Sequence, residues 1–153
     1  MFTNTLILET YKPDLWIIDA PLTWVDPTFG TLEVPLGFIT DLASIPRALR
    51  GLPDFDPNGV SRRPAAMHDW LYAWRKPGKD FADSFLRAAL LAEGASDLDA
   101  CAFYDAVHFF GSQAWGADAR VLDDVGLEGS FDTAEHFQAW MATPRTVVTL
   151  PSK

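Results

Sequence analysis

The order of residue patterns along the chain predicts an α+β fold, with an N-terminal antiparallel β meander followed by a three-helix region. Residues 1–42 alternate short β-branched and aromatic runs with prolines and glycines, which is typical of short strands joined by turns. Residues 43–116 instead carry apolar side chains at helical spacing, and residues 117–153 are weakly patterned. With 153 residues, of which 48% are hydrophobic, we expect a single domain, 1–153.

The predicted strands are the runs TLILET, LWIID, LTWV and TLEVP. The residues that separate them are Pro13, Pro21, Pro27, Gly30 and Pro35. Proline cannot donate to a sheet and glycine adopts turn conformations, so each of these residues favours a strand end. Short connections of this kind join antiparallel strands.

Three helical patterns follow. Residues 64–75 carry an apolar stripe, and Pro64 suits the first helical position, where its missing N–H is not needed. Residues 79–93 carry a second stripe that ends at Gly94, a good C-cap. The third pattern begins at Ser96, a residue type that caps helix N-termini.

The charge balance excludes some partners. With 12 Lys and Arg against 21 Asp and Glu, the net charge is −9, which argues against nucleic-acid binding because that needs cations to neutralise phosphates. No stretch approaches the roughly 18 apolar residues of a membrane span, and the start of the chain lacks the features of a secretory signal. A single Cys101 excludes an internal disulfide, and we expect it to be buried as a small apolar residue.

The run AAMHDWLYAW, residues 65–74, places polar side chains within an apolar segment. If Met67 is set at zero on a helical wheel, the other residues of the apolar stripe lie within about 60° of it; these are Trp70, Leu71 and Trp74. His68, Tyr72 and Asp69 lie at about 100°, 140° and 200°. We therefore expect these three residues to share a face that the core stripe does not use.

These residue types suggest a chemistry. An imidazole titrates near neutrality and can take a proton from water, while a carboxylate can hold a hard cation. His68 and Asp69 point about 100° apart, so we expect different roles for them. His68 then needs another carboxylate to orient its ring, for which Asp83 on the next helix is the first candidate and Asp105 the second.

Each of these residues also has a structural interpretation. His68 can be a hydrogen-bonded packing residue, Asp69 a solvated one, and Asp83 a partner of Arg87 at i+4. Asp41, just past a predicted strand, can either cap a following helix or reach the face of His68. The run DFDPNG, residues 54–59, has part of a calcium-loop pattern without its final Glu, so it is either a turn or a cation-binding loop.

The segments VPLGFITDLASIPR (34–47) and AAMHDWLY (65–72), followed by AD at 82–83, resemble a family of small phage and prophage proteins of unknown function. The resemblance covers about residues 30–115. It implies a phage or prophage origin and synthesis in the cytoplasm of a bacterial host.

HDWLY and the later AD also resemble the catalytic helix of phospholipases A2, in the disulfide-free form carried in some viral capsids. That resemblance implies that His68 is the general base, Asp69 a calcium ligand, Tyr72 a support for the dyad and Asp83 the partner that orients His68. The glycine-rich calcium loop of those enzymes is not plainly present here. The strand-rich residues 1–42 have no counterpart in them.

Three functional hypotheses follow. The first is a phage-encoded, virion-associated hydrolase that uses His68 and Asp83 on a lipid ester or cell-envelope substrate, with Ca²⁺ or another divalent cation held by Asp69 and Asp41. The second is a non-catalytic tail or baseplate component or adaptor, bound to other particle proteins, in which the same side chains form a packing network. An inhibitor of a host enzyme is a third hypothesis, compatible with the acidic charge.

Overall fold

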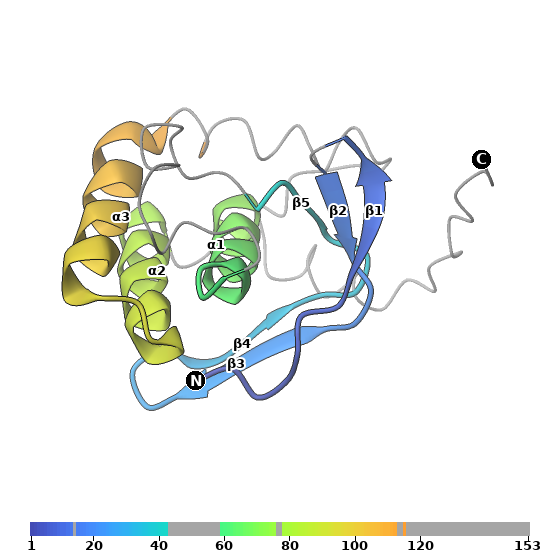
Figure 1. Ribbon diagram of the computed structural model, residues 1–153, viewed down its shortest axis with the longest axis horizontal. Helices are drawn as coiled ribbons and strands as arrows, with labels where there is room; N and C mark the ends of the chain where they lie inside the picture. The colour runs from blue at the N-terminus through green and yellow to red at the C-terminus, as the bar shows by residue number, and fades with distance from the viewer. Residues whose placement is uncertain (14, 43–58, 76–77, 113–114, 116–153) are drawn as a thin grey trace.

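The computed structural model describes residues 1–13, 15–42, 59–75, 78–112 and 115. Antiparallel strands come first and three helices follow, which confirms the predicted α+β fold (Figure 1). The strands are β1 (Leu8–Lys12), β2 (Leu15–Ile18), β3 (Leu22–Asp26), β4 (Gly30–Val34) and β5 (Ile39–Thr40). The helices are α1 (Arg62–Trp74), α2 (Lys79–Glu93) and α3 (Asp97–Phe110).

The strands divide between two sheets, a three-stranded sheet in the order β1-β2-β5 and a β3-β4 hairpin. The meander is therefore interrupted, because β5 returns to pair with β2 and not with β4. Two backbone bonds extend this pairing, from Ile18 N to Phe38 O and from Gly37 N to Ile18 O. Gly37 has a φ of 85°, a conformation that favours glycine. This return places Thr40 beside the helices.

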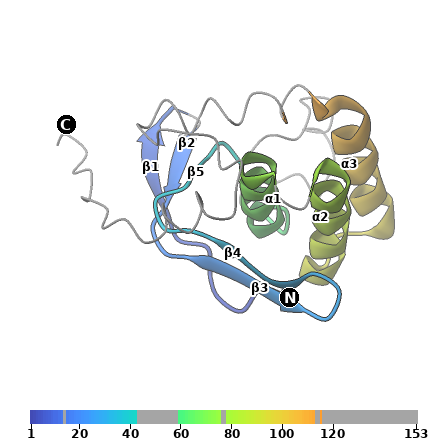
Figure 2. The same cartoon turned by 180° about the vertical axis from the view of Figure 1, so that it is seen from behind.

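Helix α1 forms the middle of the molecule, with the sheet of β1, β2 and β5 on one side and α2 followed by α3 on the other (Figures 1 and 2). The β3-β4 hairpin runs below α1 and α2 in Figure 1. Every residue from Pro64 to Ala73 is buried. The strand-rich region contacts both α1 and α2, through edge-to-face contacts of Phe38 with Trp70 of α1 and of Trp24 with Phe85 of α2. Because α1 is covered on several sides, the polar face predicted for it is buried as well as its apolar stripe.

The helix ends largely follow the prediction. Gly94 ends α2 in the left-handed conformation, and the Ser96 hydroxyl accepts a hydrogen bond from the Asp99 N–H at the start of α3. Helix α1 begins at Arg62, two residues before the predicted start. Pro64 is tolerated there because it still lies in the first turn, where backbone N–H groups have no helical partner.

Cys101 is exposed, so the expectation that it is buried was wrong. It lies on the outer side of α3, away from the Ala100 and Phe103 side chains that pack into the core. None of the described helices is long and apolar enough to cross a membrane. Residues 54–58 of the DFDPNG run and the weakly patterned segment 117–153 lie outside the described residues.

Candidate functional site

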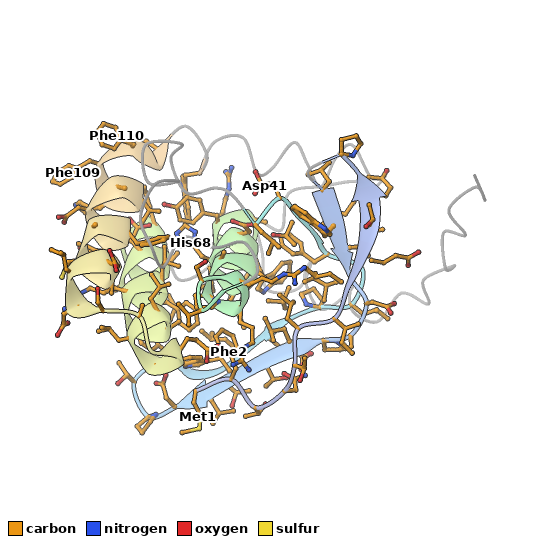
Figure 3. The ribbon with its side chains drawn as sticks, in the orientation of Figure 1. Met1, Phe2, Asp41, His68, Phe109 and Phe110 are labelled. Carbon is orange, nitrogen blue, oxygen red and sulfur yellow. The ribbon has the colours of Figure 1, made fainter. Side chains whose placement is uncertain are left out.

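The first polar cluster joins α1 to α2 through the Asp83 carboxylate. The Tyr72 hydroxyl donates to Asp83 Oδ1 at 2.6 Å, and His68 Nε2 lies 3.4 Å from the same oxygen. His68 and Tyr72 are one turn apart on α1, and their rings are tilted with centroids 4.1 Å apart. All three side chains are buried. The structure thus brings together the three residues that the sequence proposed as a catalytic group, and Figure 3 shows His68 in the interior.

Lys79 connects this cluster to α3. Its ammonium donates to Asp83 Oδ2 at 2.7 Å and to the carbonyl oxygens of Val107 and His108 at 2.8 and 3.0 Å. These carbonyls belong to the last turn of α3, the negative end of the helix dipole. Lys79 therefore joins the second oxygen of Asp83 to the C-terminal end of α3.

Gly111 allows the end of α3 to approach α1 closely. A Cβ atom at this position would collide with Val107 O and with the Tyr72 hydroxyl oxygen. The Tyr72 hydroxyl also lies 3.5 Å from Val107 O. A side chain at position 111 would therefore push α3 away from the Tyr72–Asp83 hydrogen bond.

The surroundings of His68 and Asp83 set the charges of these two side chains. Burial lowers the pKa of His68 below 6.5, an effect that the neighbouring Asp83 carboxylate opposes and does not cancel, so the imidazole is neutral near pH 7. Burial by itself would raise the pKa of Asp83. Hydrogen bonds from His68, Lys79 and Tyr72 outweigh it and hold that pKa below 3.8. The pair is therefore a neutral imidazole beside an ionised carboxylate.

The two nitrogens of His68 have different surroundings. A neutral imidazole carries one proton, and the contact between Nε2 and the carboxylate places it on Nε2. Nδ1 is then a lone-pair acceptor, and it is buried without a hydrogen-bond partner among the described residues. This arrangement can accept a proton at Nδ1 while Asp83 stabilises the resulting imidazolium.

The second polar contact lies on the strand side of α1. The Thr40 hydroxyl at the end of β5 donates to Asp69 Oδ2 at 2.5 Å and accepts from the Leu42 N–H at 3.0 Å. Asp69 is 4% exposed, so the interpretation of this residue as a solvated one was wrong. Asp41 is half-buried and directly follows Thr40 in the chain.

A third group could hold a metal ion. Asp80, Asp83 and His108 each offer one ligand atom, and these atoms lie within 4.8 Å of one another. The group differs from the pair Asp69 and Asp41 that the sequence proposed for a cation. It joins the first turn of α2 to the last turn of α3.

Two alternatives from the sequence do not hold. Arg87 pairs with Asp97 and contacts Cys101, while the cation that pairs with Asp83 is Lys79. Asp105 is exposed on α3 and is not the partner of His68. Two residues of the polar clusters were not predicted from the sequence. The first is Lys79, whose i,i+4 spacing to Asp83 was the available signal. The second is Thr40, for which no local signal exists.

The chain belongs to the DUF1353 family, a family of proteins of unknown function, whose pattern matches residues 16–107. This match covers most of β2, all of β3 to β5, α1 and α2, and most of α3, so it includes every residue of the three polar groups except His108. No curated protein and no solved structure matches the chain significantly.

Proposed function

We propose that this protein is a hydrolase in which His68, oriented by Asp83, activates a water molecule. One observation carries the proposal, namely that a buried neutral imidazole contacts an ionised carboxylate through Nε2 while its Nδ1 has no hydrogen-bond partner among the described residues. A general base needs a free lone pair, a neutral ring and a fixed orientation. His68 combines all three.

The proposed reaction transfers the water proton twice. The water oxygen attacks a carbonyl carbon as its proton passes to His68 Nδ1, and the imidazolium so formed is stabilised by the negative charge of Asp83. The tetrahedral intermediate then expels the leaving group, which takes the proton from Nδ1. Tyr72 and Lys79 keep Asp83 ionised and in place throughout, because each donates a hydrogen bond to one of its oxygens.

A divalent cation is part of the proposal. Asp69, held by Thr40, and Asp41, the residue after Thr40, are the carboxylates proposed to hold it. Ca²⁺ fits such oxygen ligands, and its charge would stabilise the oxyanion of the intermediate. The resemblance of HDWLY and AD to the catalytic helix of phospholipases A2 agrees with these roles.

A lipid ester is the substrate that we favour over a peptidoglycan bond. Phe109 and Phe110 are each 71% exposed and point outward from the end of α3 (Figure 3). They directly follow His108, whose carbonyl binds Lys79 of the cluster. Adjacent exposed apolar side chains are found at surfaces that contact ligands, proteins or membranes. The proposed setting is a phage particle, assembled in the cytoplasm of a bacterial host.

The test is an activity assay with matched variants. The wild-type chain is incubated with phosphatidylcholine vesicles and, separately, with purified peptidoglycan, both with Ca²⁺. We expect His68→Gln to lower the rate by about 10² to 10⁴. Asp105→Asn, an exposed acidic residue on the far side of α3, should leave it unchanged. A wild-type chain that hydrolyses neither substrate, or a His68→Gln chain that remains active, would refute the proposal.

The non-catalytic phage component remains the second candidate because the cluster is so deeply buried. His68 is 1% exposed, and Asp83 and Tyr72 are fully buried, as expected for a network that fixes helix packing. In that case His68→Gln should lower the melting temperature without any activity to lose. Melting curves measured alongside the assay distinguish the two candidates.

A further inference from the structure

We propose that Asp80, Asp83 and His108 form a binding site for a transition-metal ion of the Zn²⁺ type, and that the Lys79 ammonium competes with the metal for this site. The inference does not depend on hydrolase activity, because it concerns the outer oxygen of Asp83 and the end of α3. It is also separate from the cation proposed at Asp69 and Asp41.

The three ligand atoms are spaced for a shared ion. His108 Nδ1 lies 3.6 Å from Asp83 Oδ2 and 4.0 Å from Asp80 Oδ1. Two ligands bound tetrahedrally at about 2.1 Å lie roughly 3.4 Å apart. The three atoms all lie within 4.8 Å of one another, so any pair has to move closer by about 1.4 Å at most. Asp80 can make that adjustment because its side chain is 92% exposed.

His108 Nδ1 provides an independent indication. This nitrogen is buried and has no hydrogen-bond partner among the described residues, although the ring as a whole is half-exposed. It faces two carboxylates. A metal ion between the nitrogen and the carboxylates would satisfy all three groups at once.

The electrostatics favour a doubly charged ion. Two carboxylates and the carbonyl oxygens of Val107 and His108 surround the position, and one ammonium, that of Lys79, lies among them. Asp83 Oδ1 stays with Tyr72 and His68, so only Oδ2 has to change its partner. Lys79 is a flexible side chain that can release Oδ2 and retain the two carbonyls.

The ligand set indicates the class of metal. One imidazole nitrogen with two carboxylate oxygens suits Zn²⁺ and its transition-metal neighbours, whereas Ca²⁺ and Mg²⁺ prefer oxygen alone. A metal on Oδ2 would also replace the ammonium next to Asp83. The charge next to the His68–Asp83 pair would then depend on whether the metal is bound.

The test is a calorimetric titration of the full chain with Zn²⁺. Asp80→Asn and His108→Ala should each weaken binding by about tenfold or more, since even indirect partners of a metal commonly contribute that much. Lys79→Met should tighten binding by about tenfold because a competing positive charge is removed. Asp69→Asn and Asp105→Asn should bind Zn²⁺ like the wild type.

Several results of the Zn²⁺ titration would contradict parts of this proposal. No Zn²⁺ binding by the wild type, or unchanged binding by both Asp80→Asn and His108→Ala, overturns the site. Binding that Lys79→Met fails to tighten overturns the competition. Both site variants change partly exposed side chains and should fold, which melting curves can check. Loss of Zn²⁺ binding in Asp69→Asn would instead place the metal at Asp69 and Asp41.

Discussion

His68 and Asp69 are neighbours in the sequence, yet α1 presents them to two different surroundings. His68 faces α2, where the Asp83 carboxylate also contacts a hydroxyl and an ammonium. Asp69 faces β5, where it accepts a hydrogen bond from the neutral hydroxyl of Thr40. The helical turn of about 100° per residue makes this division possible. A helix in the middle of the molecule can thus place two adjacent residues in two different polar clusters.

The two sides should differ most in their contribution to stability. Asp83→Ala removes the charged acceptor of the buried Tyr72 hydroxyl and leaves the Lys79 ammonium with only the carbonyls of Val107 and His108. We therefore expect a loss of about 3–5 kcal/mol in the free energy of unfolding. Urea denaturation measures this loss. Asp83→Asn is the control because it keeps the volume and one acceptor oxygen, and it should lose less. An Asp83→Ala chain as stable as the wild type would contradict the network.

Changes around Asp69 should lower the free energy of unfolding by less than changes around Asp83. Thr40→Val keeps the shape and removes the hydroxyl that donates to Asp69 and accepts from the Leu42 N–H, for an expected loss of about 1–3 kcal/mol. The double variant with Asp69→Asn should lose less than the sum of the two single changes, because the residues share one hydrogen bond. Strict additivity would show that the contact contributes nothing.

The pH dependence of stability should identify the His68 side. Because the pKa of folded His68 is below 6.5, the unfolded chain binds the proton first as the pH falls through 6.5. Stability should therefore decrease on acidification below pH 6.5 until the folded pKa is reached. His68→Gln should reduce this decrease, as measured by melting curves from pH 7.5 to 5. An unchanged slope would mean that His68 is not buried as a neutral ring.

Asp83 acts in a lower range of pH. Its folded pKa lies below 3.8, so its stabilising contribution is present above pH 3.8 and is lost as the pH falls through the folded value. The two residues therefore affect separate windows of the same titration. Asp83→Asn should alter the acid end and His68→Gln the range just below pH 6.5.

The helix cap at Ser96 should give the smallest loss of stability and serves as a reference for the other variants. Ser96→Ala removes the hydroxyl that accepts from the Asp99 N–H at the start of α3, at the end of that helix remote from Lys79. We expect a loss of about 1 kcal/mol by urea denaturation. The pH dependence between 7.5 and 5 should be the same as in the wild type. A change in that slope would show that α3 as a whole is coupled to the dyad.

Much of this architecture could be predicted from local patterns. Turn residues separated the strands, apolar spacing located α1 and α2 closely, and Gly94 and Ser96 ended and began helices as expected. Helical geometry also predicted different roles for His68 and Asp69. The single face expected for these residues and Tyr72 was wrong, because His68 and Tyr72 contact α2 whereas Asp69 contacts β5. The short connection to α2 made Asp83 the first candidate partner, and the two side chains do meet. Local signals succeed here because each depends on backbone preferences within a few residues.

The remaining features depended on segments that are distant in the chain. Thr40 reaches Asp69 only because β5 crosses back to β2, and Lys79 binds the carbonyls of Val107 and His108 only because α3 packs against α2. The sequence by itself determined the order of the elements and the placement of the polar residues on α1. Tertiary structure decided that those residues are buried and which charges neutralise them, since burial and pairing result from packing between elements and not from any residue's own preference.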